Sequence, residues 1–291
     1  MALSHKESSP RPLTLTVLDT YGFEALLKKV ARSFQLSLRI LPASLRPPLS
    51  LAYMLARASD TIADASSAPD FQRLALLRGL PDLFPEKSPD LGLKDAERDL
   101  LQMLPRLLEA LKTLPDQSEI IAQWRIILRG QIFDVERFAA PDAALLTPGE
   151  LEEYTYLVAG SVGEFWTRLC FKHVPNYSAR PLEEMLPLSR RFGQALQFIN
   201  ILRDRRSDAD AGRIYIPDER FYVEMQHVSE LLQSAAEYTA AIQPRSLRAA
   251  CALPLDLANQ TLALIAQHPL GVGVKVPRYK VWLALAKAFW H

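Results

Sequence analysis

GQALQFINILRDRRSD, residues 193–208, is the stretch from which the rest of the chain can be interpreted. On a helix, at about 100° per residue, one narrow stripe carries Gln197, Asn200, Asp204 and Asp208. Apolar side chains cover most of the remaining surface. A helix that is apolar nearly all round is typical of a buried element. The stretch therefore predicts a buried helix whose thin acidic line faces an internal cavity.

A second stretch, YMLARASDTIAD at residues 53–64, repeats this layout. Tyr53, Arg57, Asp60 and Asp64 fall on one side of the predicted helix, and the opposite side is apolar. The two aspartates of each stretch have the i, i+4 spacing that places both carboxylates on one helix face. Two such faces turned toward each other can hold hard divalent cations and, through them, a diphosphate.

Each aspartate pair, taken alone, is equally compatible with ordinary solvated carboxylates. The same spacing on the same narrow stripe in both helices favours a shared cavity, because buried carboxylates are costly unless they are paired or bound to metal. The pairs lie 144 positions apart, counted from Asp60 to Asp204. Only tertiary packing can bring them together.

The composition is that of a globular protein. The chain has 291 residues, of which 49% are hydrophobic and 23% charged, and its net charge of +1 argues against a nucleic-acid partner. The only cysteines, Cys170 and Cys251, exclude a disulfide framework and fit a reducing cytoplasm. We expect one domain over residues 1–291, a flexible N-terminus at 1–15, and a monomer.

The sequence contains no obvious membrane-spanning or targeting segment. Residues 1–12 lack the apolar core of a signal peptide. No uninterrupted apolar run reaches the roughly 20 residues that span a bilayer. The apolar stretch 280–290 is interpreted as a packed terminal helix, with a membrane-surface contact as the alternative. We therefore expect a cytoplasmic protein with at most a peripheral contact at the inner membrane.

The rest of the chain shows the same helical pattern. Glycine is scarce, with 11 residues, and apolar residues recur at three- and four-residue spacing between prolines. These patterns predict an all-α protein. The expected helices lie near residues 20–36, 44–65, 70–80, 92–113, 117–138, 148–173, 182–209, 228–242, 245–267 and 277–290.

Other catalytic signatures are missing from the sequence. The five histidines form no zinc-binding pattern, and the chain has neither a phosphate-binding P-loop nor a Gly-x-Ser-x-Gly elbow. Residues 271–276 begin like a dinucleotide fingerprint but lack its third glycine, so we interpret them as a turn.

Together, these segments resemble squalene and phytoene synthases. The two aspartate stretches resemble the two aspartate-rich motifs of that family, in order. Three further segments match: residues 32–34 (Arg-Ser-Phe), 154–163 between the motifs, and 212–217 (Gly-Arg-Ile-Tyr-Ile-Pro) after them. The resemblance runs from about residue 30 to 220. It implies an isoprenoid synthase fold with a central cavity, and head-to-head joining of two allylic diphosphates.

The resemblance also implies roles for individual residues. Mg²⁺, with Mn²⁺ as an alternative, would be held by Asp60, Asp64, Asn200, Asp204 and Asp208. Arg57 would contact phosphate, or alternatively pair with a neighbouring aspartate, and Gln197 would orient phosphate or water. Ser33 would bind the other diphosphate. Tyr154 would position the base for proton loss. Arg32, Arg57 and Arg203 match positions that contact NADPH.

The residues that form the wall of the cavity are indicated less specifically by the sequence. Aromatic candidates for stabilising a carbocation are Phe34, Tyr53, Phe165, Phe192 and Phe198, although most aromatics at helical spacing are plain core. Asp134 could face the same cavity. Gly160 and Gly163 would make room for prenyl chains, or alternatively allow close packing of helices.

The sequence indicates the family more specifically than it indicates the product. The Asp-Thr-Ile-x-Asp sequence of the first motif is closer to that of squalene synthases. It therefore favours farnesyl diphosphate as the substrate, squalene as the product and NADPH as the reductant. Ala63 departs from the glutamate that many squalene synthases carry there. Presqualene diphosphate, hydroxysqualene and phytoene remain alternative products. Outside this class, the alternative is a catalytically silent helical scaffold.

Overall fold

The computed structural model describes residues 22–31, 38, 41–65, 67–82, 91–139 and 147–268. Within these ranges the chain is helical and contains no β-strand, so the predicted all-α class is confirmed. The helices are α2 (Phe23–Ala31), α4 (Arg46–Ala63), α5 (Asp70–Gly79), α6 (Asp95–Leu111), α7 (Gln117–Arg137), α8 (Pro148–Thr155), α9 (Ser161–His173), α10 (Leu182–Asp210), α11 (Phe221–Ala241) and α12 (Arg245–Gln267).

Several predictions fall on residues outside these ranges. They are the flexible N-terminus at 1–15, the terminal helix at 277–290, and the roles of Arg32, Ser33 and Phe34.

Two predicted helices differ from the observed ones. The helix expected at 148–173 is divided by a π-helical turn, Tyr156–Gly160, between α8 and α9. The helix expected at 228–242 begins earlier, at Phe221, directly after a short 3₁₀ turn at Asp218–Arg220. The first turn of α11 exposes Tyr222 and Val223, so it lacks the apolar periodicity from which a helix is recognised.

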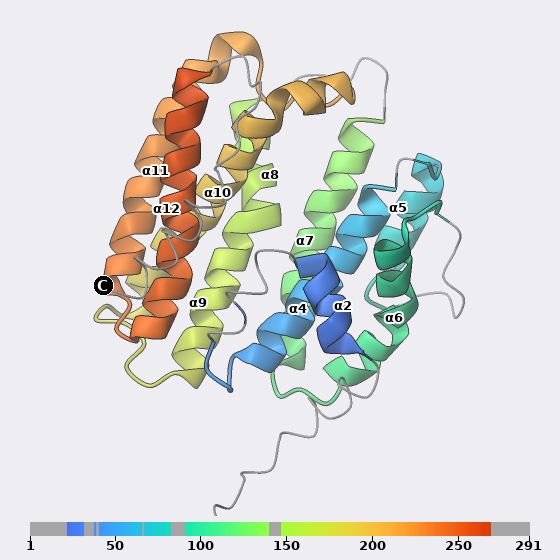
Figure 1. The fold of residues 1–291 in the computed structure, drawn as a ribbon, viewed down its shortest axis with the longest axis horizontal. Coiled ribbons are helices and arrows are strands. Elements are labelled where there is room, and N and C mark those ends of the chain that lie inside the picture. The colour runs from blue at the N-terminus through green and yellow to red at the C-terminus, as the bar shows by residue number, and fades with distance from the viewer. Residues whose placement is uncertain are drawn as a thin grey trace, which may run out of the picture.

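Helix α4 lies between α6 and α7 and is held there by its apolar face (Figure 1). Two prolines stand in its first turn, where the backbone N–H groups have no partner within the helix. Leu51, Met54, Leu55, Ala58 and Ile62 are fully buried. This burial fixes the rotation of α4 and turns its polar side toward a cavity that α10 also lines.

Helix α10 is the longest described helix, with 29 residues, and packs against α9, α11 and α12 (Figure 1). Two glycines bring it into backbone contact with the α8–α9 segment. A Cβ atom on Gly193 would lie 2.1 Å from the carbonyl oxygen of Ala159, and one on Gly163 would lie 2.1 Å from that of Ser189. Gly163 thus serves helix packing, the alternative given above, and does not widen the cavity.

Helix α12 bears on the prediction that no segment spans a membrane. Among the described helices it alone is long and apolar enough, by length and composition, to cross a membrane, although polar residues such as Asp256 and Asn259 interrupt its apolar sequence. It packs against α10 and α11, and 39% of its most apolar window is buried.

Candidate functional site

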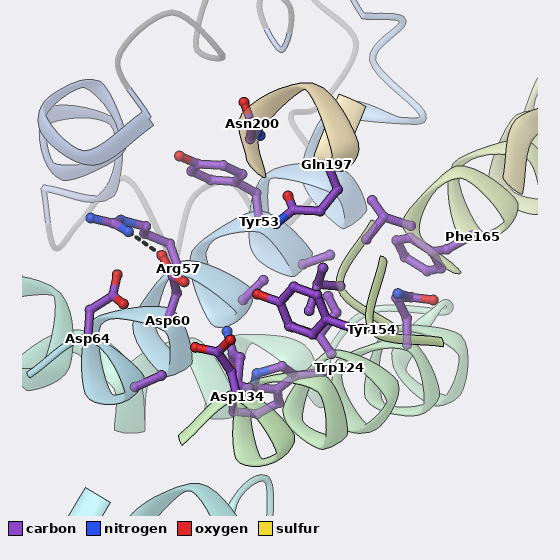
Figure 2. A pocket seen from close by; sticks show the side chains of 18 of the residues that line it. Tyr53, Arg57, Asp60, Asp64, Trp124, Asp134, Tyr154, Phe165, Gln197 and Asn200 are labelled. Atoms are coloured by element: carbon purple, nitrogen blue, oxygen red, sulfur yellow. Dashed lines mark hydrogen bonds and ion pairs between the residues drawn. The ribbon is translucent and has the colours of Figure 1, made fainter. Parts of the chain in front are cut away.

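A cavity of about 760 Å³ opens between α4, α7, α8, α9 and α10. Figure 2 shows side chains from these helices converging on it, with Asp60, Asp64 and Asp134 on one side and Phe165 on another. Its volume lies within the range of about 300–1,000 Å³ that is usual for ligand sites. The cavity has an acidic end and an apolar end, which are described in turn.

The first aspartate pair lies at the C-terminal end of α4. Asp60 accepts a hydrogen bond from Arg57, one turn earlier on the same helix (Figure 2). Asp64 is the residue that caps the helix. Desolvation in the cavity, followed by repulsion from Asp64, raises the pKa of Asp60 to about 6 even with Arg57 beside it.

The second pair lies near the C-terminal end of α10. Asp204 accepts hydrogen bonds from Arg203, its neighbour in the chain, one of them at 2.8 Å from Arg203 Nε. Desolvation raises the pKa of Asp208 to about 6, and repulsion from Asp204 adds to the effect. Both pairs thus combine one carboxylate that has its own arginine with a second that does not.

Arg213, in the segment after α10, joins the two pairs. Its guanidinium lies 3.9 Å from Asp64 Oδ1, 3.9 Å from Asp134 Oδ2 and 3.6 Å from Asp208 Oδ1. These three carboxylates come from α4, α7 and α10. One positive charge therefore lies among acidic groups from three helices.

Two tyrosines close the acidic end beside Asp134. The hydroxyl of Tyr215 donates a hydrogen bond to Asp134, and its ring stacks on Tyr154 with 5.4 Å between the centroids. Phe138 contacts the Tyr215 ring edge-on at 4.9 Å. Burial raises the pKa of Asp134, although the Tyr215 hydrogen bond opposes this. Burial also raises the pKa of Tyr154 well above its usual value, so its hydroxyl keeps its proton at neutral pH.

The apolar end of the cavity contains polar side chains whose donors point into the wall. Trp124 Nε1 donates to Ser59 Oγ at 3.1 Å, and Gln123 Nε2 donates to Ser161 Oγ at 2.9 Å. Trp166 donates to the hydroxyl of Tyr177 at 3.3 Å. The cavity surface there is consequently formed by rings and methylene groups.

The structure brings most of the predicted site residues together at this cavity. Those that line it are Tyr53, Arg57, Asp60, Asp64, Asp134, Tyr154, Phe165, Gln197, Asn200, Asp204 and Asp208. Among the described residues, those that were predicted but are not in the lining are Arg203, Gly160, Gly163, Phe192 and Phe198.

The two aromatic candidates outside the lining belong to the protein core. Phe192 packs edge-on against Tyr238, and Phe198 packs edge-on against His227. Both side chains are buried. Phe192 and Phe198 are therefore core residues, which was the alternative to a role in the cavity.

Two residues of the lining, Arg213 and Tyr215, were not predicted as site residues, and Gln131 was noted only as lying on the same predicted helix as Asp134. Arg213 and Tyr215 belong to a segment, 212–217, that was noted only for its resemblance. Gln131 lies one turn before Asp134 on α7, and its buried side-chain oxygen has no hydrogen-bond partner in the described part of the chain. A three- and four-residue spacing along α7 from Ile120 to Asp134 was the available signal.

The donor chemistry suits a hard divalent cation, but the described side chains are not closed around one. Five aspartates line the cavity, and carboxylate oxygen is the ligand that Mg²⁺ prefers. Burial, together with repulsion from neighbouring aspartates, raises the pKa of Asp60 and of Asp208 to about 6. Even so, no three acidic, histidine or cysteine side chains of the described ranges are near enough to one point to ligate an ion together. Arginines stand beside these carboxylates instead.

Comparison with known proteins gives a consistent result. The squalene/phytoene synthase family model matches residues 27–225. A bifunctional lycopene cyclase/phytoene synthase from Colletotrichum graminicola is 32% identical over 66% of this chain and 33% of its own length. The squalene synthase ERG9 of Gibberella zeae is 26% identical over 84% of this chain and 58% of its own. The chain thus spans about a third of the length of the bifunctional relatives.

Solved structures agree on the fold. The structure of TcSQS with the ligand BPH1237 superposes with a TM-score of 0.77 at 22% identity, covering 94% of this chain and 86% of that one. The family model covers more than half of the sequence and includes both aspartate stretches, the segment 154–163 and the segment 212–217. The chain belongs to the squalene/phytoene synthase family.

Proposed function

We propose that this protein is a Mg²⁺-dependent prenyltransferase that joins two farnesyl diphosphates head to head, through presqualene diphosphate, and reduces the product to squalene with NADPH. The observation that carries the proposal is a single cavity with paired aspartates at one end and an apolar wall at the other. A prenyl diphosphate has the same division, with a charged head and a long hydrocarbon tail.

The acidic end would receive the diphosphates. Asp60, Asp64, Asp204 and Asp208, together with Asn200, would hold Mg²⁺. When bound, Mg²⁺ would neutralise the leaving diphosphate as a Lewis acid. Arg57 is the nearest cation on α4 and can turn from Asp60 to a phosphate oxygen, for which its planar guanidinium is well suited.

The apolar end would protect the allylic cation. Because the donors of Trp124, Gln123 and Trp166 are engaged in the wall, few polar atoms face the chains of the substrate. The rings of Tyr53 and Phe165 line the cavity and can stabilise a cation through their π-faces. Tyr154, which stays protonated, would orient the released diphosphate as it accepts the proton lost from the substrate.

The substrate and the reductant are proposed from the first aspartate motif and from the family resemblance. Relatives of this chain include both squalene synthases and phytoene synthases. The sequence of the first aspartate motif favours an enzyme of the squalene synthase type. NADPH would supply hydride to the final cation, and Arg203, on the helix that carries the second pair, is the described candidate for contacting it.

The test is a product analysis of the purified chain. It should be incubated with Mg²⁺ and either farnesyl or geranylgeranyl diphosphate, with and without NADPH. Squalene formed from farnesyl diphosphate only when NADPH is present is the expected result. Accumulation of presqualene diphosphate or hydroxysqualene would replace the last step of the proposal, and phytoene would replace the substrate. No turnover of either diphosphate would favour a silent scaffold.

A further inference from the structure

Arg213 differs from the other arginines beside the aspartates. Arg57 and Arg203 each donate hydrogen bonds to one aspartate on their own helix. Arg213 instead lies 3.6–3.9 Å from three carboxylates on three helices, which is longer than a hydrogen bond. Its buried Nε has no hydrogen-bond partner within the described ranges. The side chain thus occupies the gap between the carboxylates without binding tightly to any of them.

The backbone around Arg213 fixes this position. Gly212 has a φ of +78°, a left-handed conformation that favours glycine, and it reverses the chain at the end of α10. The backbone N–H of Arg213 then donates to the carbonyl oxygen of Asp208 at 2.8 Å. Two residues later, Tyr215 is anchored on Asp134 and Tyr154. Arg213 is therefore held on both sides with its side chain over the acidic end.

The surroundings require a cation at this point. Asp64, Asp134 and Asp208 all line the cavity, and their carboxylates approach the same guanidinium from three different helices. A guanidinium remains charged at any pH at which the protein is folded. It can therefore compensate these carboxylates whenever no metal ion is present, although its loose geometry leaves room for a better ligand to replace it.

We propose that Arg213 is the resident counter-ion of the candidate metal site. It holds Asp64, Asp134 and Asp208 in place while the site has no metal, and it competes with the divalent cation for Asp64 and Asp208. This would explain why the donors suited to Mg²⁺ within the described ranges are not closed around one point. The inference rests on the proposed function for the identity of the cation, but its test does not depend on turnover.

The experiment measures Mn²⁺ binding to the full chain without substrate, by electron paramagnetic resonance of the free ion. Arg213→Gln should bind Mn²⁺ more tightly than wild type, by about fivefold or more, as expected when a competing ligand is removed. Its melting temperature should fall in EDTA and recover in saturating Mn²⁺. Arg57→Gln is the matched control. Arg57→Gln removes a charge that contacts only one carboxylate of the site, Asp60. The affinity of this variant for Mn²⁺ should therefore increase less than that of Arg213→Gln.

The outcomes separate this inference from the proposed function. Unchanged or weaker Mn²⁺ binding by Arg213→Gln, or an equal gain in Arg57→Gln, would overturn the counter-ion role alone. Absence of binding by wild type and all variants would overturn the metal site itself. If Arg213→Gln does not fold, Arg213→Lys retains the charge with fewer donors. Its affinity for Mn²⁺ should then lie above that of wild type, and an unchanged affinity would overturn the proposal.

Discussion

The two aspartate pairs have the same spacing. In each pair, the first aspartate and the second aspartate have different kinds of counter-ion. The first members, Asp60 and Asp204, each have an arginine on their own helix, at three residues and at one residue distance. The second members, Asp64 and Asp208, share Arg213 from a segment outside both helices. The first kind of contact belongs to a single helix. The second kind depends on how α4, α10 and the chain after α10 are assembled.

The helices that carry the pairs are also anchored differently. Side chains hold α4, through a row of fully buried apolar residues. Backbone contacts hold α10, at Gly163 and Gly193. Side-chain packing tolerates small adjustments, whereas a close backbone contact does not. We therefore expect the position of the second pair to be the more sensitive of the two to changes far from the cavity.

The largest effect is expected from neutralising the first member of either pair. If the two pairs share one metal site, Asp60→Asn and Asp204→Asn should each lower kcat by about a hundredfold or more, because several kcal/mol of transition-state stabilisation are lost. Product formation from farnesyl diphosphate measures the effect, and circular dichroism checks the fold. Loss in one variant with a near-normal rate in the other would mean that the pairs do not act together.

The next prediction concerns the anchoring of α10. Gly193→Ala places a methyl group against the carbonyl of Ala159, so α10 must shift, and we expect the free energy of unfolding to fall by about 1–3 kcal/mol. Urea denaturation provides the measurement. Gly149→Ala is the control, because a Cβ at that position of α8 meets nothing within 4 Å, and its effect should be neutral or slightly stabilising. Equal stability of the two variants would contradict the backbone contact.

A smaller effect is expected where the segment after α10 joins α7. Tyr215→Phe removes the hydroxyl that donates to Asp134 and keeps the ring that stacks on Tyr154. The free energy of unfolding should fall by about 1 kcal/mol, the usual net value of one hydrogen bond. Tyr222→Phe, at an exposed tyrosine a few residues later, is the matched control and should change little. If both variants behave alike, Tyr215 does not help to fix Arg213.

The difference between the pairs also explains what could be predicted from the sequence. The polar stripes of α4 and α10 were visible because a helix places residues of known spacing on one face. The local partners Arg57 and Arg203 were within the same stretches. Arg213 and Tyr215 follow the end of a helix, where no periodicity indicates the direction of a side chain. Their place among the carboxylates depends on the turn at Gly212.

Other errors have equally specific physical causes. Gly163 could not be assigned from the sequence, because a cavity wall and a close helix contact both favour a residue without a side chain. Phe192 and Phe198 have the same helical spacing as cavity residues but face the core on the other side of α10. The start of α11 was missed because it exposes Tyr222 and Val223 while it buries Glu224, which pairs with Arg220.

The smallest predicted effect tests the side of α10 that faces away from the cavity. His227 of α11 lies 3.4 Å from Glu152 of α8, and Glu152 also accepts a hydrogen bond of 2.7 Å from Gln194 of α10. The hydrogen bond with Glu152 raises the pKa of His227, and the charges of Glu152, Glu224 and Glu230 add to this.

A raised histidine pKa stabilises the folded state below the unfolded pKa of about 6.5 and loses this contribution as the pH rises through the folded pKa. Because both side chains are partly exposed, the contribution should be only about 0.5 kcal/mol. The unfolding free energies of wild type and His227→Gln should therefore differ more at pH 6 than at pH 8.5. Asp60 and Asp208 titrate in the same range, but they are present in both proteins and cancel in the difference. A difference that does not change with pH would mean that α10 has no titrating anchor on this side, so that its position depends on the glycine contacts and apolar packing alone.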